Sequence, residues 1–304
     1  MRILLTGATG FVGGHISRRL LAGGHELLAL TRTPPRTAAR ERTSLSWLAG
    51  DLRDVGRVKG RLAAFAPEAC VHAGWEGIPD FSEELSRANL SCSIDLLDAL
   101  FNETPCRRLL VTGSCAEYGR ASGPCVESSP CESTSFFAWA KRALFDYASM
   151  LGRRRSAEVL WFRIFYAYGP GQRRGALIPS LVDAFQRGRP PEVANPLNAN
   201  DFIHVEDVAE AFASAIDRTP EAGIYNLGSG RATSVLDVCR IAEELVTGST
   251  RVCDALSPGA GQAEPCRFWA DTHKTRAELG WTPSIDLRSG IGRLLAPAPS
   301  LPSP

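Results

Sequence analysis

Short apolar runs alternate with amphipathic segments through the first half of the chain. Apolar residues recur at helical spacing over 11–21, 55–65, 81–101 and 139–151, which predicts a helix in each segment. Strands that alternate with helices are typical of a parallel sheet, so residues 1–165 are expected to form a doubly wound α/β domain. The expected strands are the apolar runs 3–6, 26–30, 44–48, 69–72, 108–112 and 159–164.

The pattern is less regular in the second half, where the breakers Gly169-Pro170-Gly171 and Arg189-Pro190-Pro191 interrupt it. We expect residues 166–295 to build mainly a smaller α/β lobe over the carboxyl edge of the sheet, and segments near 201–205 to complete the sheet. The Pro- and Ser-rich residues 296–304 are expected to form a flexible tail. Helices are expected near 176–187, 205–217, 233–246 and 272–279.

Composition and charge narrow the possible partners. The chain has 34 Lys and Arg residues against 33 Asp and Glu, so its net charge of +1 gives no global attraction to nucleic acid or anionic lipid. No apolar run approaches the ~20 residues that a membrane-spanning helix needs. None of the nine cysteines forms a C-x-x-C pair, which disfavours a metal site, and their odd number favours a reducing, cytoplasmic compartment. The expectation is no metal, no nucleic acid and no membrane.

Three glycines, Gly7, Gly10 and Gly13, lie between the first expected strand and the first expected helix. Gly7 would permit a tight turn, Gly10 a close approach of the backbone to a pyrophosphate, and Gly13 the packing of the helix on the strand. The free N–H groups at the start of the helix would then bind the phosphates. The spacing is G-x-x-G-x-x-G rather than the commoner G-x-G-x-x-G, but its place between strand and helix predicts a dinucleotide site.

The end of the second expected strand bears on the choice of cofactor. Sites that prefer NAD usually have an acid there, which binds the ribose hydroxyls, whereas this chain has Arg32, with Arg36 nearby. An arginine can pair with a 2′-phosphate, so we expect a preference for NADP(H), with NAD(H) possible. The alternative is that Arg32 is a solvated loop residue. Asp51, after the third strand, could accept a hydrogen bond from the adenine amino group.

Together these motifs resemble the extended short-chain dehydrogenase/reductases, specifically the NAD-dependent epimerase/dehydratase family of nucleotide-sugar enzymes. The resemblance implies a Rossmann-like doubly wound parallel sheet with a smaller C-terminal α/β substrate lobe, a nucleotide-sugar substrate and a homodimer. It covers nearly the whole chain. The matching segments are 7–13, 50–52, 71–74, 111–119, 163–170, 201–209, 225–230 and 279–283, with Asn89 and Lys141 between them.

The resemblance also implies the residues that bind cofactor and substrate. Asn200 replaces the arginine that the family commonly uses on substrate phosphates, and Arg173, Arg174 or Arg267 could supply that charge instead. Each of these arginines could equally be an ordinary surface residue, and His204 is expected to orient the backbone. The expected cofactor-binding residues are Gly7, Thr9, Gly10, Phe11, Val12, Gly13, Arg32, Arg36, Asp51, Leu52, His72, Ala73, Gly74, Asn89 and Lys141, and the expected substrate-binding residues are Ser114, Cys115, Tyr166, Arg173, Asn200 and Arg267.

The catalytic motif departs from the family. The family uses Ser, Tyr and Lys, in which the lysine lowers the pKa of the tyrosine and the tyrosine exchanges a proton with the sugar as hydride moves. Ser114 and Lys141 match, but Phe137 stands four residues before Lys141, at the tyrosine position. Phenylalanine cannot donate a proton, so the family's acid/base is missing.

Three explanations remain open. Another hydroxyl could replace the tyrosine: Tyr166, Tyr118, or Ser114 with a water. The enzyme could use different chemistry, with a contribution from Cys115 or Glu117. The protein could also bind a dinucleotide without turning it over. For both tyrosines a packed side chain with a satisfied hydroxyl is the simpler interpretation.

The residues after Ser114 narrow the reaction. Sugar 4,6-dehydratases of the family carry an Asp-Glu pair where this chain has Cys115 and Ala116, so dehydration is not expected. Cys115 is one residue away from the catalytic cysteine of the fucose-forming epimerase-reductases, on the opposite face of a strand, and is expected to be buried. The leading prediction is an NADPH-dependent reductase of a keto-sugar nucleotide, as in deoxysugar or secondary-metabolite biosynthesis. A nucleotide-sugar epimerase and a catalytically silent regulatory protein are the alternatives.

Overall fold

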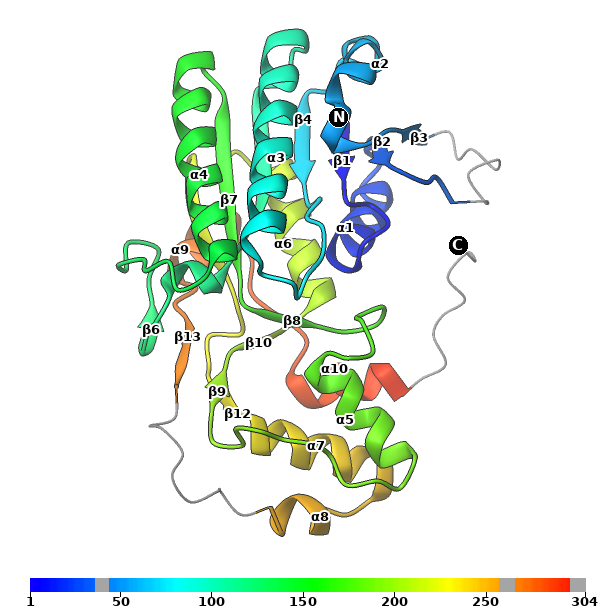
Figure 1. The fold of residues 1–304 in the computed structure, drawn as a ribbon, viewed down its shortest axis with the longest axis vertical. Helices are drawn as coiled ribbons and strands as arrows, with labels where there is room; N and C mark the ends of the chain where they lie inside the picture. Colours follow the sequence, from blue (N-terminus) through cyan, green and yellow to red (C-terminus); the bar gives the residue numbers. More distant parts are fainter. Residues whose placement is uncertain (36–43, 257–265, 296–304) are drawn as a thin grey trace.

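A computed structural model describes residues 1–35, 44–256 and 266–295. Its centre is a seven-stranded sheet in the order β11-β7-β5-β4-β1-β2-β3, in which every neighbouring pair is parallel (Figure 1). The Rossmann-like doubly wound fold predicted from the sequence is confirmed. The strands are β1 (Arg2–Thr6), β2 (Glu26–Thr31), β3 (Leu45–Ala49), β4 (Ala69–His72), β5 (Arg108–Ser114), β7 (Glu158–Ile164) and β11 (Gly223–Leu227).

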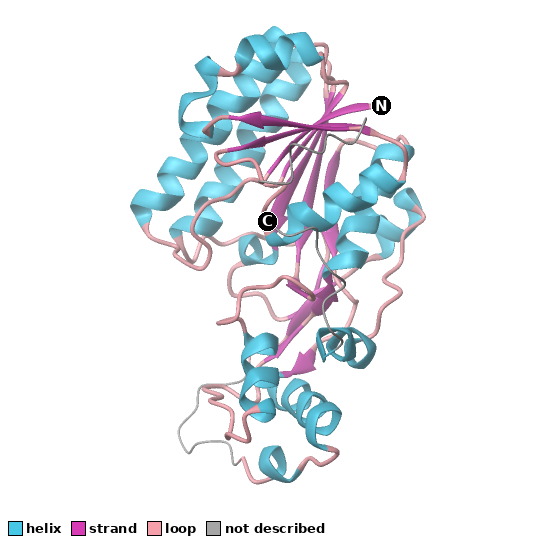
Figure 2. Cartoon of the chain, turned by 90° about the vertical axis from the view of Figure 1, so that its right-hand side faces the viewer, coloured by secondary structure: helices cyan, strands magenta, loops and turns pink. Residues whose placement is uncertain are grey.

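Helices cover both faces of this sheet (Figure 2). Successive residues of a strand point to opposite faces, so Ile3 and Leu5 of β1 pack in one hydrophobic cluster and Leu4 in another. The first cluster lies under α1 and α6, and the second under α2, α3 and α4. The bounds of these helices are α1 (Phe11–Ala22), α2 (Lys59–Phe65), α3 (Glu83–Glu103), α4 (Phe136–Arg155) and α6 (Val205–Asp217).

The smaller lobe lies beyond the carboxyl ends of the strands (Figure 1). A third hydrophobic cluster forms its core, with Leu181, Phe185, Val238 and Ile291 among its members. Its helices are α5 (Leu177–Gln186), α7 (Val235–Thr247), α8 (Arg251–Asp254) and α10 (Leu287–Leu295), and two-stranded sheets join β9 (Ala199–Asn200) to β12 (Thr233–Ser234), β8 (Tyr166–Tyr168) to β10 (Phe202–His204), and β6 (Gly123–Cys125) to β13 (Phe268–Ala270).

The strand that completes the sheet is not the expected one. Residues 202–204 pair with β8 in a separate sheet, and β11 instead runs along β7, with Leu227 beside Ile164. The chain leaves the main sheet after Ile164 and forms β8 outside it. The apolar run at 202–204 pairs with β8 there, and β11 pairs with the free edge of β7. Because α6 and α9 (His273–Leu279) also border the sheet, the second half of the chain contributes to both layers.

Two boundaries that differ from the prediction bear on the site. Strand β5 continues to Ser114, and α4 begins at Phe136, where the Ser135 side chain accepts a hydrogen bond from the Ala138 N–H. Phe137 therefore lies in the first turn of α4. The helix expected over 55–65 is divided into a 3₁₀ segment, Leu52–Arg57, and α2, because Asp54 is non-helical and Gly56 is a poor helix former. The predicted tail 296–304 lies outside the described residues.

Candidate active site

The glycine turn lies so close to the segment after β4 and to the start of α1 that side chains at Gly7 and Gly13 would have no room. Gly7 has a φ of +74°, and a Cβ added there would lie 2.5 Å from the Ala73 carbonyl oxygen. A Cβ on Gly13 would lie 2.1 Å from the Gly7 carbonyl oxygen. Gly10 caps α1 without a side-chain hydrogen bond, so the N–H groups of the first helical turn remain available to a ligand.

A cleft opens over this turn, and most of the residues expected to bind cofactor line it. The exceptions are Phe11, Val12, Gly13, His72 and Lys141, which do not line it, and Arg36, which lies outside the described residues. Sequence reasoning missed Arg53, Trp75 and Glu76, although they directly follow two of the matching segments, 50–52 and 71–74. The expected residues that line the cleft are Gly7, Thr9, Gly10, Arg32, Asp51, Leu52, Ala73, Gly74 and Asn89.

His72 belongs to a buried hydrogen-bond chain rather than to the cleft. The Gly74 N–H donates to Thr6 Oγ1, which lies 2.8 Å from His72 Nδ1, and His72 Nε2 lies 2.9 Å from Ser93 Oγ. Burial lowers the pKa of His72 to about 3, with a smaller contribution from the nearby Lys141 charge. The imidazole is therefore neutral, and it connects β1, β4 and α3 behind the cleft.

Asn89 also holds protein backbone. Its Oδ1 accepts a hydrogen bond from the Glu76 N–H at 2.8 Å, and its Nδ2 donates to the Glu76 carbonyl at 3.1 Å. The loop that carries Trp75 and Glu76 is thus tied to α3.

Arg32 and Arg53 converge on one carboxylate at the edge of the cleft. Arg32 Nη1 lies 2.6 Å from Glu76 Oε1, and Arg53 Nη2 lies 2.7 Å from Glu76 Oε2. Asp51 accepts a hydrogen bond from the Arg53 N–H at 2.9 Å, which fixes the turn after β3. The three charged side chains are partly exposed, so a bound anion can reach the arginines.

Ser114 lies at the carboxyl end of β5, over a buried ion pair. Its N–H donates to Glu117 Oε1 at 2.8 Å, and Arg163 Nε lies 2.9 Å from Glu117 Oε2. The hydroxyl of Ser114 accepts from the Ala116 N–H at 3.1 Å, and no hydrogen bond within the described ranges uses it as a donor. Its proton is free for a ligand, whereas Glu117, 0% exposed and paired, is structural.

Lys141 is enclosed by aromatic rings. Its Nζ donates to the Thr112 carbonyl at 2.7 Å and lies 3.8 Å from the centre of the Trp75 ring. Phe137 packs edge-on against Trp75, with ring centres 5.7 Å apart, and lies 4.7 Å from Phe81. Burial lowers the pKa of Lys141 to about 7, although the neighbouring Glu117 charge raises it.

The other proposed proton donors differ in exposure. Tyr118 is buried, and its hydroxyl donates to Asn226 Oδ1 at 2.7 Å, which supports the interpretation as a packed tyrosine. Cys115 is buried in a cluster with Phe165 and Phe268, as expected, and burial raises its pKa. It is therefore not available as a nucleophile. It is also not available as a substrate contact, although the resemblance implied that role. Tyr166 is 43% exposed, and partial burial raises its pKa.

Apart from Ser114 and Cys115, the residues expected to bind substrate lie on several segments of the smaller lobe. Asn200 and Arg267 are close together because Ala199 bridges to Arg267, whereas Arg173 and Arg174 are exposed in the turn before α5. His204 is buried and accepts a hydrogen bond from the Glu206 N–H at the start of α6, so it orients backbone as expected.

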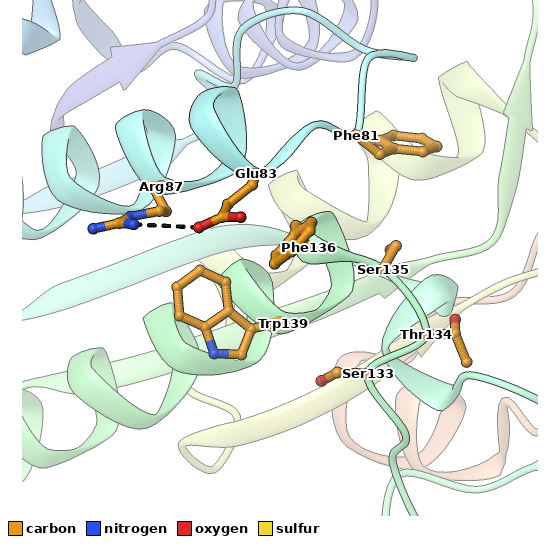
Figure 3. Close-up of a pocket in the computed structure, with 8 residues that line it drawn as sticks. All are labelled: Phe81, Glu83, Arg87, Ser133, Thr134, Ser135, Phe136 and Trp139. Carbon is orange, nitrogen blue, oxygen red and sulfur yellow. Dashed lines mark hydrogen bonds and ion pairs between the residues drawn. The ribbon is translucent and has the colours of Figure 1, made fainter.

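An open hollow of about 750 Å³ lies where α3 and α4 begin. Figure 3 shows Phe136 and Trp139, on the first turn of α4, facing the ion pair of Glu83 and Arg87. These rings are 47% and 40% exposed. The hollow is a surface of the sheet domain beside the aromatic rings that enclose Lys141.

In the part of the chain that the structure describes, histidine, cysteine and acidic side chains form no group of three or more that could hold a metal ion. No helix in these ranges is long and apolar enough to cross a membrane.

Comparison with known proteins identifies the family. The model of the NAD dependent epimerase/dehydratase family matches residues 3–228. The chain therefore belongs to this family of enzymes, and the resemblance drawn from the sequence motifs is confirmed.

Relatives of known activity align along nearly their whole length. The chain is 27% identical to a dTDP-L-rhamnose 4-epimerase of Burkholderia thailandensis, over 96% of this chain and 93% of the relative. It is 27% identical to a UDP-glucose 4-epimerase of Corynebacterium glutamicum, over 95% and 93%. Among solved structures, MoeE5 in complex with UDP-glucuronic acid and NAD is 29% identical, with a TM-score of 0.80, over 96% of this chain and 97% of that chain.

Proposed function

We propose that the chain is a cytoplasmic reductase of keto-sugar nucleotides that consumes NADP(H). The observation that carries the proposal is Phe137 at the position of the family's catalytic tyrosine. An epimerase must first remove a proton from a sugar hydroxyl as hydride leaves, which requires a base. A reductase starts from a carbonyl and requires only a proton donor after hydride arrives. The loss of the tyrosine therefore harms reduction less than epimerisation.

We assign the donor role to Ser114. Its hydroxyl accepts from the Ala116 N–H, and its own proton is free, at the carboxyl edge of the sheet where ligands of doubly wound folds bind. Lys141, buried with a pKa near 7, lies on the adjoining helix. When bound, the dinucleotide would supply the hydride, and Gly7, Gly10 and the start of α1 would hold its pyrophosphate.

A panel of keto-sugar nucleotides tests the proposal. With NADPH present, we expect the absorbance of the reduced nicotinamide to fall and the sugar to gain two hydrogens. Inversion of a sugar without net oxidation of the cofactor would instead identify an epimerase. The epimerase is the second candidate because the two curated relatives described above are named 4-epimerases. Tight binding of NADPH with neither reaction would identify the silent regulatory protein.

The preference for NADP(H) is proposed from Arg32 and Arg53, whose guanidinium groups converge on Glu76 and could take a 2′-phosphate in its place. The MoeE5 structure contains NAD, so NAD(H) is the competing cofactor.

Arg32→Ala is expected to weaken NADPH binding about tenfold, by the loss of one charge-assisted hydrogen bond worth roughly 1.4 kcal/mol, and to leave NADH binding nearly unchanged. Isothermal titration with both cofactors measures this, and Arg57→Ala, on the same side of the sheet but outside the cleft, is the control. Tighter binding of NADH than NADPH by the wild type, unaltered by Arg32→Ala, would contradict the preference.

We also propose that a second copy of the chain covers the exposed apolar side chains of α4, namely Phe136, Trp139 and Met150. Their spacing places them along one side of the helix, and a patch of this kind is typical of an interface. Sedimentation should give twice the mass of one chain, and Trp139→Glu should shift the protein to the single-chain mass. A wild type that sediments as a single chain would contradict the homodimer.

A further inference from the structure

Aromatic rings cover Lys141 and separate it from the cofactor cleft, although the family reaction needs the lysine beside the cofactor. The Lys141 side chain is 3% exposed, with the Trp75 indole 3.8 Å above its Nζ and the Phe137 ring 5.8 Å away. The ammonium donates its hydrogen bond to the Thr112 carbonyl, inside the sheet. A ligand in the cleft therefore meets the indole before it meets the ammonium.

Trp75 is held in this place from two sides. The Gly74 N–H before it donates to Thr6 Oγ1 at 3.0 Å, and the Glu76 N–H after it donates to Asn89 Oδ1 at 2.8 Å. The indole itself packs edge-on against Phe137. Phe137 also packs against Phe81, with ring centres 4.7 Å apart, so the phenylalanine and the tryptophan form one apolar unit over Lys141.

The extent of the cleft agrees with this arrangement. Trp75 lines the cleft together with the glycine turn and the ends of β2 and β3. Ser114, Phe137 and Lys141, all three within the described part of the chain, do not line it. The open part of the cleft is therefore the place for an adenosine diphosphate group, and it stops short of Lys141.

We propose that Trp75 keeps Lys141 from binding the nicotinamide ribose, so that the cleft holds the dinucleotide mainly by its adenosine diphosphate half and releases it after each turnover. This rests on the proposed function, because a reductase must exchange its cofactor in every cycle, whereas an epimerase regenerates its cofactor and can retain it. Trp75 is thus a specificity-determining residue that favours an exchangeable cofactor over a resident one.

The experiment compares two ligands that differ by the nicotinamide and its ribose, NADPH and 2′-phospho-ADP, by isothermal titration. The wild type is expected to bind both with similar affinity. In Trp75→Leu the ammonium is uncovered and can reach the nicotinamide ribose, so NADPH should bind about tenfold more tightly, with 2′-phospho-ADP, which lacks that ribose, unchanged. Stopped-flow measurements should show the gain mainly as slower dissociation of NADPH. Trp47→Leu, in β3 and outside the cleft, is the matched control and should change neither ligand.

Several outcomes would overturn the inference. Weaker NADPH binding in Trp75→Leu, with 2′-phospho-ADP unchanged, would mean that the indole holds the nicotinamide or its ribose. Equal affinities in wild type and variant would mean that the indole has no such role. A wild type that binds neither ligand would overturn the proposed function itself. If Trp75→Leu does not fold, Trp75→Phe takes its place, because the smaller ring uncovers part of the ammonium. Its affinity for NADPH must then exceed that of the wild type, by less than the tenfold expected for leucine.

Discussion

Replacing Ser114 with alanine is expected to lower the rate of keto-sugar reduction by about 10²–10⁴-fold, the usual contribution of a general acid. The reason is that Tyr118 donates to Asn226, Glu117 is paired with Arg163, and Phe137, which we place at the family's tyrosine position, carries no hydroxyl. That leaves the hydroxyl of Ser114, the last residue of β5, as the proton donor at the carboxyl end of this strand. Turnover of a keto-sugar nucleotide under saturating NADPH measures the effect.

Two variants distinguish the hydroxyl from its structural role. Ser114→Thr retains the hydroxyl and should keep most of the activity, although the side chain also accepts from the Ala116 N–H. Tyr166→Phe removes the hydroxyl of the exposed tyrosine and should leave the rate within a few-fold of the wild type. If Tyr166→Phe abolishes turnover while Ser114→Ala does not, the proton comes from Tyr166 and our assignment is wrong.

Replacing Arg163 with methionine is expected to destabilise the chain by about 3–5 kcal/mol, because it leaves the Glu117 carboxylate buried without its partner. The side chains of Arg163 and Glu117 are 4% and 0% exposed, and Glu117 also accepts hydrogen bonds from Trp161 Nε1 and the Ser114 N–H. Urea denaturation measures the free energy of unfolding.

The control is the same substitution at an exposed pair. Arg288→Met breaks a bidentate ion pair with Glu244 in which both side chains are about half exposed, and it should change stability little. The double variant Glu117→Gln/Arg163→Met should recover part of the loss, because the amide that remains is neutral. A loss at Arg163 no larger than at Arg288 would show that the buried pair does not support the end of β5.

Much of the fold followed from the sequence because strand and helix periodicities are local. The strand 69–72 was predicted at its observed bounds, and most other elements to within a few residues. The edge strand β11 was missed because which segment pairs with β7 depends on where the chain leaves the sheet at Ile164, which no local pattern records.

The site was only partly predictable for the same reason. The glycine turn is a local motif, and Gly7, Thr9 and Gly10 of it line the cleft. The contacts of Glu76 with Arg32 and of Trp75 with Lys141 join residues 44 and 66 positions apart, so no spacing rule finds them. Asn89 lines the cleft and His72 does not, and their hydrogen bonds turn His72 toward the protein interior and Asn89 toward the loop backbone.

The most direct test of the account is a single-turnover reaction of the purified wild type with NADPH and a keto-sugar nucleotide. We predict that one NADPH is oxidised for each sugar reduced, and that the oxidised cofactor leaves the protein and can be recovered by filtration. Sugar inversion with the cofactor retained on the protein, or tight NADPH binding with an unchanged sugar across the panel, would contradict the account.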